Sequence, residues 1–466
     1  MPLKPEQPAA PARVQDPFPL AFGERARAFC WGAEGPLSVG RYLGEAHALA
    51  DWLDREAAGA TEVLNLCEDR YRFLLLLGAA LLTGRPNLLP SSRAPSVVEE
   101  MLARHPDALA VGDDGHADGV RLAQRPSRYR SMPVDASPAD EPAQGAHSVQ
   151  IAGDQLAVVG YTSGSSGIPA PHRKSWRQFH LSTAENLSLL DDVGTGPWHV
   201  VATVPPQHMY GMETSVLLPL LGSVCIHRSR PFFPADIIHA LQQMPAPRVL
   251  VTTPVHLRSL IGAGLPNPPL ALILSATAPL PQALAADAER LTGARVLELF
   301  GSTETCVIGH RQTARTELWR PQPGVLLDAG DEGTSVTAPW LPQPVLLQDR
   351  MQVEPDGSFR LVGRCSDHLE IAGKRASLID ITQRLLALPG VEDAAVFVPD
   401  SAGAVTRLAA LVVAPGQEAA ALVAALRETV DPVFLPRPLR LVSRLPRNET
   451  DKLPRQALLD ALGRVS

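Results

Sequence analysis

The sequence has few cysteines, and their pattern suits neither cross-links nor metal binding. The five cysteines are scattered along the chain, at Cys30, Cys67, Cys225, Cys306 and Cys365. Their number is odd, and they form no C-x-x-C pair and no zinc-ligand spacing. This usage argues against a disulfide scaffold and a zinc module, and it indicates a reducing compartment.

The sequence also lacks an excess of positive charge and any long apolar run. The net charge of −7 argues against a nucleic-acid-binding protein, because such proteins carry a basic surface. The longest apolar run, at 73–82, is about half the ~20 residues that a membrane-spanning helix needs. The first 19 residues are rich in proline and alanine and contain no apolar signal-peptide core. We therefore expect a cytoplasmic protein with no nucleic-acid partner and no membrane span.

Segments with helical and strand-like patterns alternate through most of the chain. Helices are predicted near 41–58, 70–83, 96–104, 179–190 and from 212 to 221. Strands are predicted near 62–66, 87–90, 156–159, 199–204, 224–226, 249–252, 270–274 and 295–300. This alternation predicts an α/β fold with a mostly parallel sheet. The polar segment 113–144 is predicted to be a surface loop.

The pattern changes after Pro321 to short alternating segments, which indicates a β-rich part with a hairpin turn at Asp356-Gly357. From residue 364 a compact module follows. Its predicted helices lie near 377–388 and 418–429, and its predicted strands near 394–398 and 408–413.

A loop rich in glycine and hydroxyl side chains follows the predicted strand 156–159. This Gly/Ser loop reads Tyr161-Thr-Ser-Gly-Ser-Ser-Gly-Ile-Pro169. Glycines let backbone pass close to a ligand, and consecutive N–H groups with serine hydroxyls can bind a polyphosphate. No G-K-[ST] follows at Walker spacing, and no serine stands in G-x-S-x-G. A flexible linker is the alternative for the loop taken alone.

Three later strands also end in turns rich in glycine, proline or hydroxyl side chains. These turns lie at 205–211, 275–280 and 301–305. In open α/β sheets, ligands bind beyond the carboxyl ends of strands. We therefore expect the three turns to be walls of one site.

Five motifs in order resemble those of the adenylate-forming superfamily of acyl- and aryl-CoA synthetases, luciferase-like enzymes and peptide-synthetase adenylation domains. The Gly/Ser loop resembles its phosphate loop, Phe300–Glu304 its Y-G-x-T-E, and Leu347–Asp349 its T-G-D. Gly363-Arg364, followed by a glycine turn, resembles its G-R-x-D-D, and Pro446–Arg455 its closing P-R-x-x-x-G-K-x-x-R. The first 150 residues match this superfamily in texture alone.

The resemblance implies an α/β fold in two domains and a two-step reaction. The large N-terminal domain, 1–365, would combine parallel-rich sheets and helices with a β-rich subdomain. A small, mobile α+β domain at 366–466 would carry the catalytic lysine. A carboxylate would attack the α-phosphorus of ATP, giving an acyl-adenylate and pyrophosphate, and a thiol would then displace AMP.

The resemblance also assigns roles to single residues. Lys452 would contact the α-phosphate, Glu304 would bind Mg²⁺, and Asp349 and Arg364 would hold the ribose. His208 would lie beside the tunnel for the carboxylate and the thiol. Other nucleotide contacts would come from Thr162, Ser163, Gly164, Ser165, Ser166, Gly167, Thr277, Ala278, Phe300, Gly301, Ser302 and Thr303, and the acid pocket from Tyr210, Gly211 and Ser275.

Three positions depart from the superfamily motifs. Ala170 stands where a lysine usually follows the proline of the loop, and Lys174, four residues on, is a candidate replacement. Ser366 replaces the first acid of G-R-x-D-D at the expected hinge, and Asp451 replaces the glycine before the final lysine. These departures motivate an alternative, a regulatory nucleotide-binding homologue that has lost turnover.

The identity of the acid and of the thiol rests on weaker signals. No carrier-protein segment follows Lys452, so CoA or a separate acyl carrier protein would act in trans. The last 36 residues hold seven Lys/Arg against four Asp/Glu, which suits either acceptor. A hydrogen bond from Tyr210 to a substrate hydroxyl would favour a hydroxybenzoate-like acid, as in the stand-alone ligases of aryl-polyene and xanthomonadin-type pigment clusters. A fatty acid is the alternative.

Overall fold

The computed structural model divides the chain into two compact units. Unit 1 comprises Met1–His199 and Met212–Ser229, and unit 2 comprises Val200–Gly211 and Arg230–Ser466. The structure describes residues 16–90, 92–113, 128–133, 149–162, 170–330, 332–364, 368–371, 374–399, 407–447 and 453–464. The chain crosses between the units within strand β11 (Trp198–Ala202) and again after Gly211 and Ser229.

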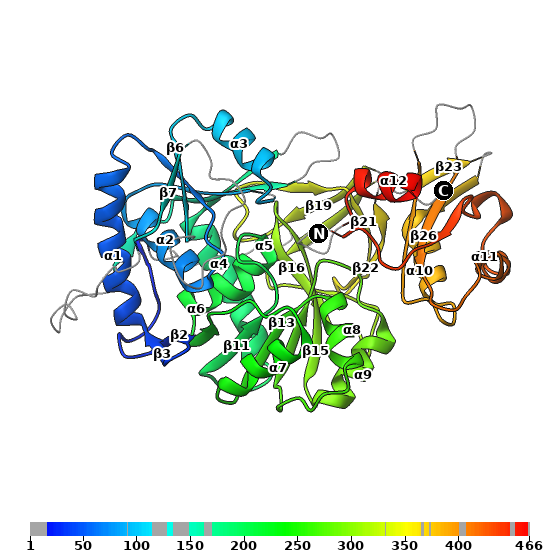
Figure 1. Ribbon diagram of the computed structural model, residues 1–466, viewed down its shortest axis with the longest axis horizontal. Helices are drawn as coiled ribbons and strands as arrows, with labels where there is room; N and C mark the ends of the chain where they lie inside the picture. The colour runs from blue at the N-terminus through cyan, green and yellow to red at the C-terminus, as the bar shows by residue number, and fades with distance from the viewer. Residues whose placement is uncertain are drawn as a thin grey trace, which may run out of the picture. The chain divides into compact units, whose positions relative to one another are not determined.

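A six-stranded sheet forms the centre of unit 1, in the order β10-β9-β5-β4-β6-β7. All neighbours in it are parallel except β9 and β10. The strands are β4 (Glu62–Asn65), β5 (Asn87–Leu89), β6 (Ala108–Gly112), β7 (Tyr129–Ser131), β9 (Leu156–Thr162) and β10 (Ala170–Ser175). The helices α1 (Val39–Glu56), α2 (Arg70–Leu82) and α3 (Pro95–Arg104) complete this layered part (Figure 1). The predicted α/β alternation is confirmed, but β7 lies inside the segment predicted to be only loop.

The apolar run 73–82 belongs to helix α2, which is buried on all sides and packs against α1 and β4. A Cβ atom at Gly78 would lie 2.3 Å from the Tyr42 hydroxyl of α1, so glycine is required at this contact. The helix begins at the Asp69 cap, whose carboxylate accepts the Arg72 backbone N–H at 2.9 Å. In the described part of the chain, no helix is both long and apolar enough to cross a membrane.

The rest of unit 1 includes a segment with unusual helical geometry. The predicted helix ending at Leu221 begins as a π-helix, η1 (Met212–Leu217), and continues as α6 (Leu218–Leu221). Helix α4 (Trp176–Asp191) starts with a capping box between Ser175 and Gln178. The remaining strands are β1 (Phe18–Pro19), β2 (Ala28–Gly32), β3 (Gly35–Ser38), β8 (Gln150–Ile151) and β12 (Val224–His227), with β12 parallel to β2.

Unit 2 contains three parallel strands that are extended by an antiparallel hairpin. These are β13 (Arg248–Thr252), β14 (Leu272–Ser275), β15 (Arg295–Ser302), β16 (Cys306–Arg311) and β17 (Arg320–Pro321). Its helices include α5 (Met209–Gly211), α7 (Pro234–Gln243), α8 (Pro254–Gly262) and α9 (Gln282–Thr292). Helices α8 and α9 lie side by side in Figure 1. This alternation sets three strand ends at the same edge of the sheet.

The β-rich part follows as predicted. It contains β18 (Leu326–Gly330), β19 (Gly333–Thr337) and β20 (Val345–Leu347), then the hairpin of β21 (Asp349–Val353) and β22 (Phe359–Arg364). The hairpin turns at Asp356-Gly357, where Gly357 has a φ of +84° and Asp356 accepts the Ser358 backbone N–H at 3.0 Å. The turn predicted from this Asp-Gly pair is confirmed.

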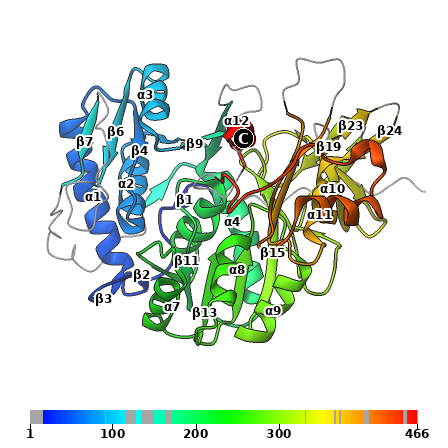
Figure 2. The same cartoon turned by 45° about the vertical axis from the view of Figure 1, so that its right-hand side comes forward.

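The C-terminal part combines a three-stranded sheet with helices, as Figure 2 shows for α10 and α11. Its elements are β23 (His368–Ile371), β24 (Lys374–Ser377), α10 (Leu378–Leu386), β25 (Asp393–Phe397), β26 (Ala409–Val413), α11 (Ala419–Arg427), η3 (Pro432–Phe434), β27 (Leu439–Leu441) and α12 (Arg455–Arg464). Apolar side chains of α10, α11 and β26 form one core, which includes Leu385, Val412 and Leu426. The predicted helices and strands of this module are therefore present.

Candidate active site

The ends of β13 and β14 in unit 2 are level with each other at one edge of its sheet, and β15 runs four residues beyond that level. Thr252 of β13 is level with Ser275 of β14, and Ser275 is level with Glu298 of β15. The turn 205–211 reaches the same edge, because the Tyr210 hydroxyl lies 3.1 Å from the Thr252 carbonyl and 2.9 Å from the Leu274 carbonyl. Helix α5, which ends this turn, also packs against β15 and β16, so the turns expected to surround one site lie near one another within unit 2.

Tyr210 serves this edge as a structural tie. Its hydroxyl proton donates to a backbone carbonyl, and burial, the main cause, raises the pKa of the phenol. The prediction that Tyr210 donates to a substrate hydroxyl is therefore corrected, since the proton already has an acceptor. Gly211 follows where a Cβ would lie 2.0 Å from the Pro205 carbonyl oxygen, and half-buried His208 lies in the same turn.

The turn after β14 contains a strained backbone and a buried hydroxyl. Thr277 has a φ of +80°, a conformation that disfavours β-branched side chains. The Ser275 hydroxyl is buried and has no hydrogen-bond partner among the described residues. Ala278, which follows Thr277, is half-buried. This turn offers one unpaired polar group beside the strand ends.

Glu298 holds this turn against β15 and was missed by the sequence interpretation. Its carboxylate accepts the Leu280 backbone N–H at 2.9 Å and the Thr313 hydroxyl at 2.6 Å. It also forms an ion pair of 2.7 Å with Arg311. The signal in the sequence was a single acid within the apolar run Val296–Phe300, because a buried carboxylate needs partners of this kind.

The hairpin between β15 and β16 presents Glu304. Ser302 pairs with Cys306, so Thr303, Glu304 and Thr305 form the turn, with Glu304 half-buried. The hydroxyls of Ser302 and Thr305 lie 3.0 Å apart, and the Trp340 indole donates to the Thr305 carbonyl at 2.8 Å. These hydrogen bonds hold in place the turn that carries Glu304.

The surroundings of Glu304 suit a magnesium ion held mainly by substrate. No group of three or more His, Cys, Asp or Glu side chains suited to a metal occurs among the residues with described positions. Mg²⁺ commonly takes one or two protein carboxylates and completes its shell with waters and substrate phosphates. A single carboxylate on a fixed turn fits that pattern.

Asp349 and Arg364 are cross-strand neighbours, a relation that sequence spacing could not show. They begin β21 and end β22, and the antiparallel register sets them opposite each other. Phe300 lies near the same hairpin, with its ring centroid 6.0 Å from that of Phe359 and 5.6 Å from that of Trp319. The hairpin of β21 and β22 therefore pairs the two residues predicted to hold the ribose, and its Phe359 ring also contacts Phe300 of β15.

In unit 1, β9 and β10 are the strands on either side of the Gly/Ser loop. Thr162 at the end of β9 pairs with Ala170 at the start of β10. Lys174 lies four residues along β10, about 13 Å away at ~3.3 Å per residue, and it is only 2% exposed. Lys174 is therefore well separated from Ala170 along the strand, and its role as a replacement lysine stays a prediction.

Several predicted residues lie outside the described part of the structure. They are Ser163, Gly164, Ser165, Ser166, Gly167, Ser366, Asp451 and Lys452. For Thr162 and Arg364 the structure describes the strand position only.

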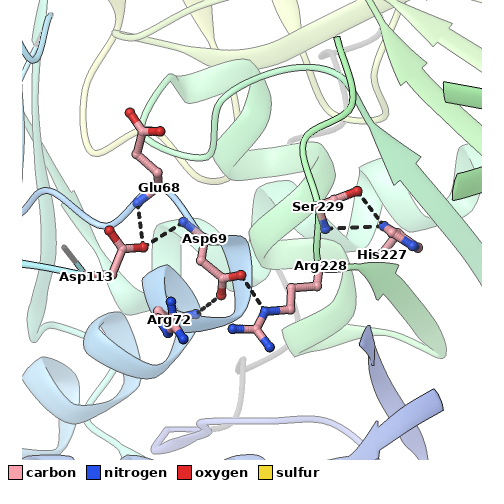
Figure 3. Close-up of polar contacts among 7 residues, drawn as sticks. All are labelled: Glu68, Asp69, Arg72, Asp113, His227, Arg228 and Ser229. Atoms are coloured by element: carbon pink, nitrogen blue, oxygen red, sulfur yellow. Dashed lines mark hydrogen bonds and ion pairs between the residues drawn. The ribbon is translucent and has the colours of Figure 1, made fainter. Parts of the chain in front are cut away.

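A separate polar cluster lies in unit 1, at the carboxyl ends of β4 and β6 (Figure 3). Asp113 accepts the backbone N–H groups of Glu68 at 3.0 Å and Asp69 at 2.8 Å. Asp69 also forms an ion pair with Arg228 (Figure 3). Burial, followed in part by the Asp69 charge, raises the pKa of Asp113. These contacts join the start of α2 to the residues that follow β6 and β12, so the charged side chains of this cluster have a structural role.

Comparison with known proteins agrees with this geometry. The family model described as AMP-binding enzyme matches residues 25–331, and that of the AMP-binding enzyme C-terminal domain matches 380–452. The chain belongs to the AMP-binding enzyme family, which is the adenylate-forming class that the motifs indicated.

Several curated relatives are named as ligases that join an acid to CoA or to a carrier protein, which confirms the predicted class of enzyme. A 4-coumarate–CoA ligase of Halorhodospira halophila is 32% identical over 303 residues, or 63% of this chain and 73% of that relative. A 3,4-dihydroxybenzoate–[aryl-carrier protein] ligase of Bacillus anthracis is 22% identical over 261 residues, or 54% of this chain and 61% of that relative.

Solved structures share the fold at low sequence identity. ATP-bound MatB from Rhodopseudomonas palustris has a TM-score of 0.77 and 19% identity, with 95% of this chain and 97% of that chain covered. The o-succinylbenzoate CoA synthetase of Bacillus subtilis in complex with its acyl-adenylate has a TM-score of 0.77 and 16% identity, with 94% and 96% covered. The predicted α/β class, with a large N-terminal and a small C-terminal domain, is confirmed.

Proposed function

We propose that the protein is an ATP-dependent carboxylate ligase that forms an acyl- or aryl-adenylate and passes the acyl group to a phosphopantetheine thiol. The observation that carries the proposal is the edge of unit 2 where β13, β14 and the turn 205–211 meet, beside the hairpin that presents Glu304. Ligands of open α/β sheets bind at such an edge. Membership of the AMP-binding enzyme family supports the same reaction.

In the first step, a carboxylate oxygen of the acid attacks the α-phosphorus of ATP. The bond from that phosphorus to the bridging oxygen breaks, and pyrophosphate leaves with the electron pair. Nucleotidyl transfer depends mainly on positioning and on neutralising oxygen charge. Glu304 would hold the Mg²⁺ that supplies positive charge, Asp349 would accept the ribose hydroxyl protons, and Lys452 would contact the α-phosphate.

In the second step, a thiol attacks the acyl carbon of the adenylate. The carbon–oxygen bond to AMP breaks, the thioester forms, and the thiol proton passes to solvent or to a nearby base such as His208. The acceptor is CoA or a separate acyl carrier protein, and the excess of Lys and Arg in the last 36 residues suits both.

We propose an aromatic acid such as a hydroxybenzoate as the substrate. Two relatives, a 4-coumarate ligase and a 3,4-dihydroxybenzoate ligase, support this class. The unpaired, buried Ser275 hydroxyl could serve a polar substituent of the acid, because a buried hydroxyl without a partner is costly. A stand-alone ligase of the pigment-cluster type is the narrower form of this proposal.

We also propose the domain boundary at 365/366, a hinge at Ser366, rotation of the C-terminal domain between the two steps, and a cytoplasmic location. The separate core of α10, α11 and β26 supports an independent C-terminal domain. Four cysteines without disulfides favour a reducing compartment.

Acid-dependent exchange of pyrophosphate into ATP tests the first step. Hydroxybenzoates and cinnamates should support exchange better than fatty acids, and Lys452→Ala should slow it roughly 100-fold or more, as removal of a charge-stabilising donor does. ATP binding without exchange for any acid would favour the regulatory homologue instead. Exchange driven best by fatty acids would overturn the aromatic class, and thioester assays with CoA and carrier protein would identify the acceptor.

A further inference from the structure

Three titratable side chains of unit 1 form a hydrogen-bonded relay that the proposed reaction does not use. The His105 Nδ1 atom lies 2.6 Å from the Glu62 carboxylate, and its Nε2 atom makes a short hydrogen bond with the Tyr161 hydroxyl. The His105 and Tyr161 rings meet edge to face, with centroids 5.8 Å apart. We call this set, Glu62–His105–Tyr161, the relay.

The relay joins three elements that are distant in sequence. Glu62 is the first residue of β4, His105 directly follows α3, and Tyr161 is next to last in β9. Tyr161 also packs against the apolar cluster between α3 and the sheet, which includes Leu64, Leu88 and Val159 (Figure 1 shows α3 and the sheet). The ring is thus packed along its length and hydrogen-bonded at its end.

The partners determine where the protons lie. An ionised Glu62 can only accept, so His105 donates from Nδ1. In a neutral imidazole, Nε2 is then the acceptor for the Tyr161 O–H, since the bond at one ring nitrogen sets the role of the other. A carboxylate thereby orients the histidine, and the histidine orients the tyrosine.

Charged side chains from β4, β10 and α3 surround the Tyr161 hydroxyl. Burial and the Glu62 charge raise the pKa of Tyr161, whereas Arg173 of β10 and Arg104 of α3 lower it. The side chains of His105 and Glu62 are 16% and 21% exposed, so the pair is largely shielded from water. Arg128 donates to the His105 carbonyl at 3.1 Å and fixes the backbone of that residue.

The relay acts at the end of the strand from which the Gly/Ser loop starts. Tyr161 pairs with Pro171 across the β9–β10 hairpin, and Thr162 pairs with Ala170. Pro171 has no backbone N–H and so donates no ladder bond at this position. The Tyr161 side chain adds a hydrogen bond to His105 near this end of the strand.

We propose that Glu62 and His105 are positioning residues that act through Tyr161, holding the end of β9 in the geometry that the Gly/Ser loop needs to bind the phosphates of ATP. The inference rests on the proposed nucleotide-binding function of that loop. It assigns to the relay an effect on ATP affinity and none on the acid.

Kinetics of ATP–pyrophosphate exchange test the relay in the full chain. Tyr161→Phe and His105→Ala should each raise the KM for ATP about fivefold, the effect of one lost hydrogen bond, with kcat and the KM for the acid unchanged. His105→Gln, whose amide can still meet the Tyr161 hydroxyl, should raise the KM less. The matched control is Tyr42→Phe, which removes a buried hydroxyl that donates to Leu74 at 3.3 Å in the same unit, and it should leave the KM for ATP unchanged.

Backbone hydrogen exchange without nucleotide separates this inference from the function it rests on. Tyr161→Phe should speed exchange in β9 and β10, whereas Tyr42→Phe should not. Unchanged exchange there, or a KM for ATP equal to that of the wild type, would overturn the relay. A wild-type protein that neither binds ATP nor exchanges pyrophosphate would overturn the proposed function. In that case, faster backbone hydrogen exchange in Tyr161→Phe would still show that the Tyr161 side chain holds the end of β9.

Discussion

Thr277 adopts a backbone conformation that its side chain disfavours. Its φ of +80° belongs to the left-handed region, where β-branched residues are rare. Such a residue costs about 1–3 kcal/mol and persists where its surroundings enforce it. Glu298 supplies that enforcement by binding Leu280 in the same turn.

Replacement of Thr277 by glycine should therefore stabilise the protein. We expect Thr277→Gly to raise the free energy of unfolding by about 1 kcal/mol. Relief of the backbone strain stabilises the folded state, and the greater conformational entropy of glycine in the unfolded chain offsets part of that gain. Chemical denaturation followed by tryptophan fluorescence measures it. Thr277→Ala keeps the Cβ and is the control, and a glycine variant no more stable than the alanine variant would contradict the strain.

The turn at Thr277 shows what a sequence can reveal about single residues. The turn 275–280 resembles the G-G-A-P turn of the adenylate-forming superfamily, which sets Thr277 at a glycine position, and the left-handed φ agrees with that match. The role of Tyr210 could not be predicted in the same way, because its acceptors are backbone carbonyls of Thr252 and Leu274. Backbone acceptors leave no mark in the amino-acid sequence.

At the scale of elements, the site depends on strands β13 and β14 ending at the same level. Parallel strands place their carboxyl ends together, and strand patterns alone predicted that edge. The sequence could not show which side chain joins the strands, nor that η1 (Met212–Leu217) departs from α-helical geometry. Periodicity reports an apolar helix without distinguishing the π form.

The Tyr210 hydroxyl should matter to the joint between β13 and β14 more than to the choice of acid. We expect Tyr210→Phe to lower the free energy of unfolding by about 1–2 kcal/mol, because a buried carbonyl loses its donor. The ratio of exchange rates for hydroxylated and unsubstituted acids should stay as in the wild type. A variant of normal stability that loses preference for the hydroxylated acid would restore the role first predicted for Tyr210.

At the scale of the whole molecule, buried histidines make stability depend on pH. Burial is the main cause that lowers the pKa of His180 in unit 1 from 6.5 to about 4. Burial likewise lowers the pKa of His256 in unit 2 to about 4. His180 Nε2 lies 3.0 Å from the Pro19 carbonyl, and His256 Nδ1 lies 3.2 Å from the Thr203 hydroxyl.

Acid should destabilise the protein through these two rings. Between pH 6.5 and 4 the unfolded chain binds protons that the folded chain does not, so stability is full above pH 6.5 and is lost as the pH falls toward 4. At about 1.4 kcal/mol per pH unit, the loss is of the order of 3 kcal/mol per histidine. Denaturant midpoints measured across this range should fall with pH, and the fall should be smaller in His180→Gln and His256→Gln; equal slopes in wild type and variants would contradict the assignment.

Four of the five cysteines are buried too deeply for chemical labelling of the native protein. Cys30, Cys67, Cys225 and Cys306 are at most 1% exposed. Burial raises the pKa of Cys225 to about 12, and it raises those of Cys30 and Cys67 as well, which leaves little reactive thiolate. A maleimide dye should therefore attach to the native protein at Cys365 or nowhere, whereas the unfolded chain should take five. Since Cys365 precedes the proposed hinge at Ser366, one dye per native chain, counted by mass spectrometry, would mark that hinge without any substitution.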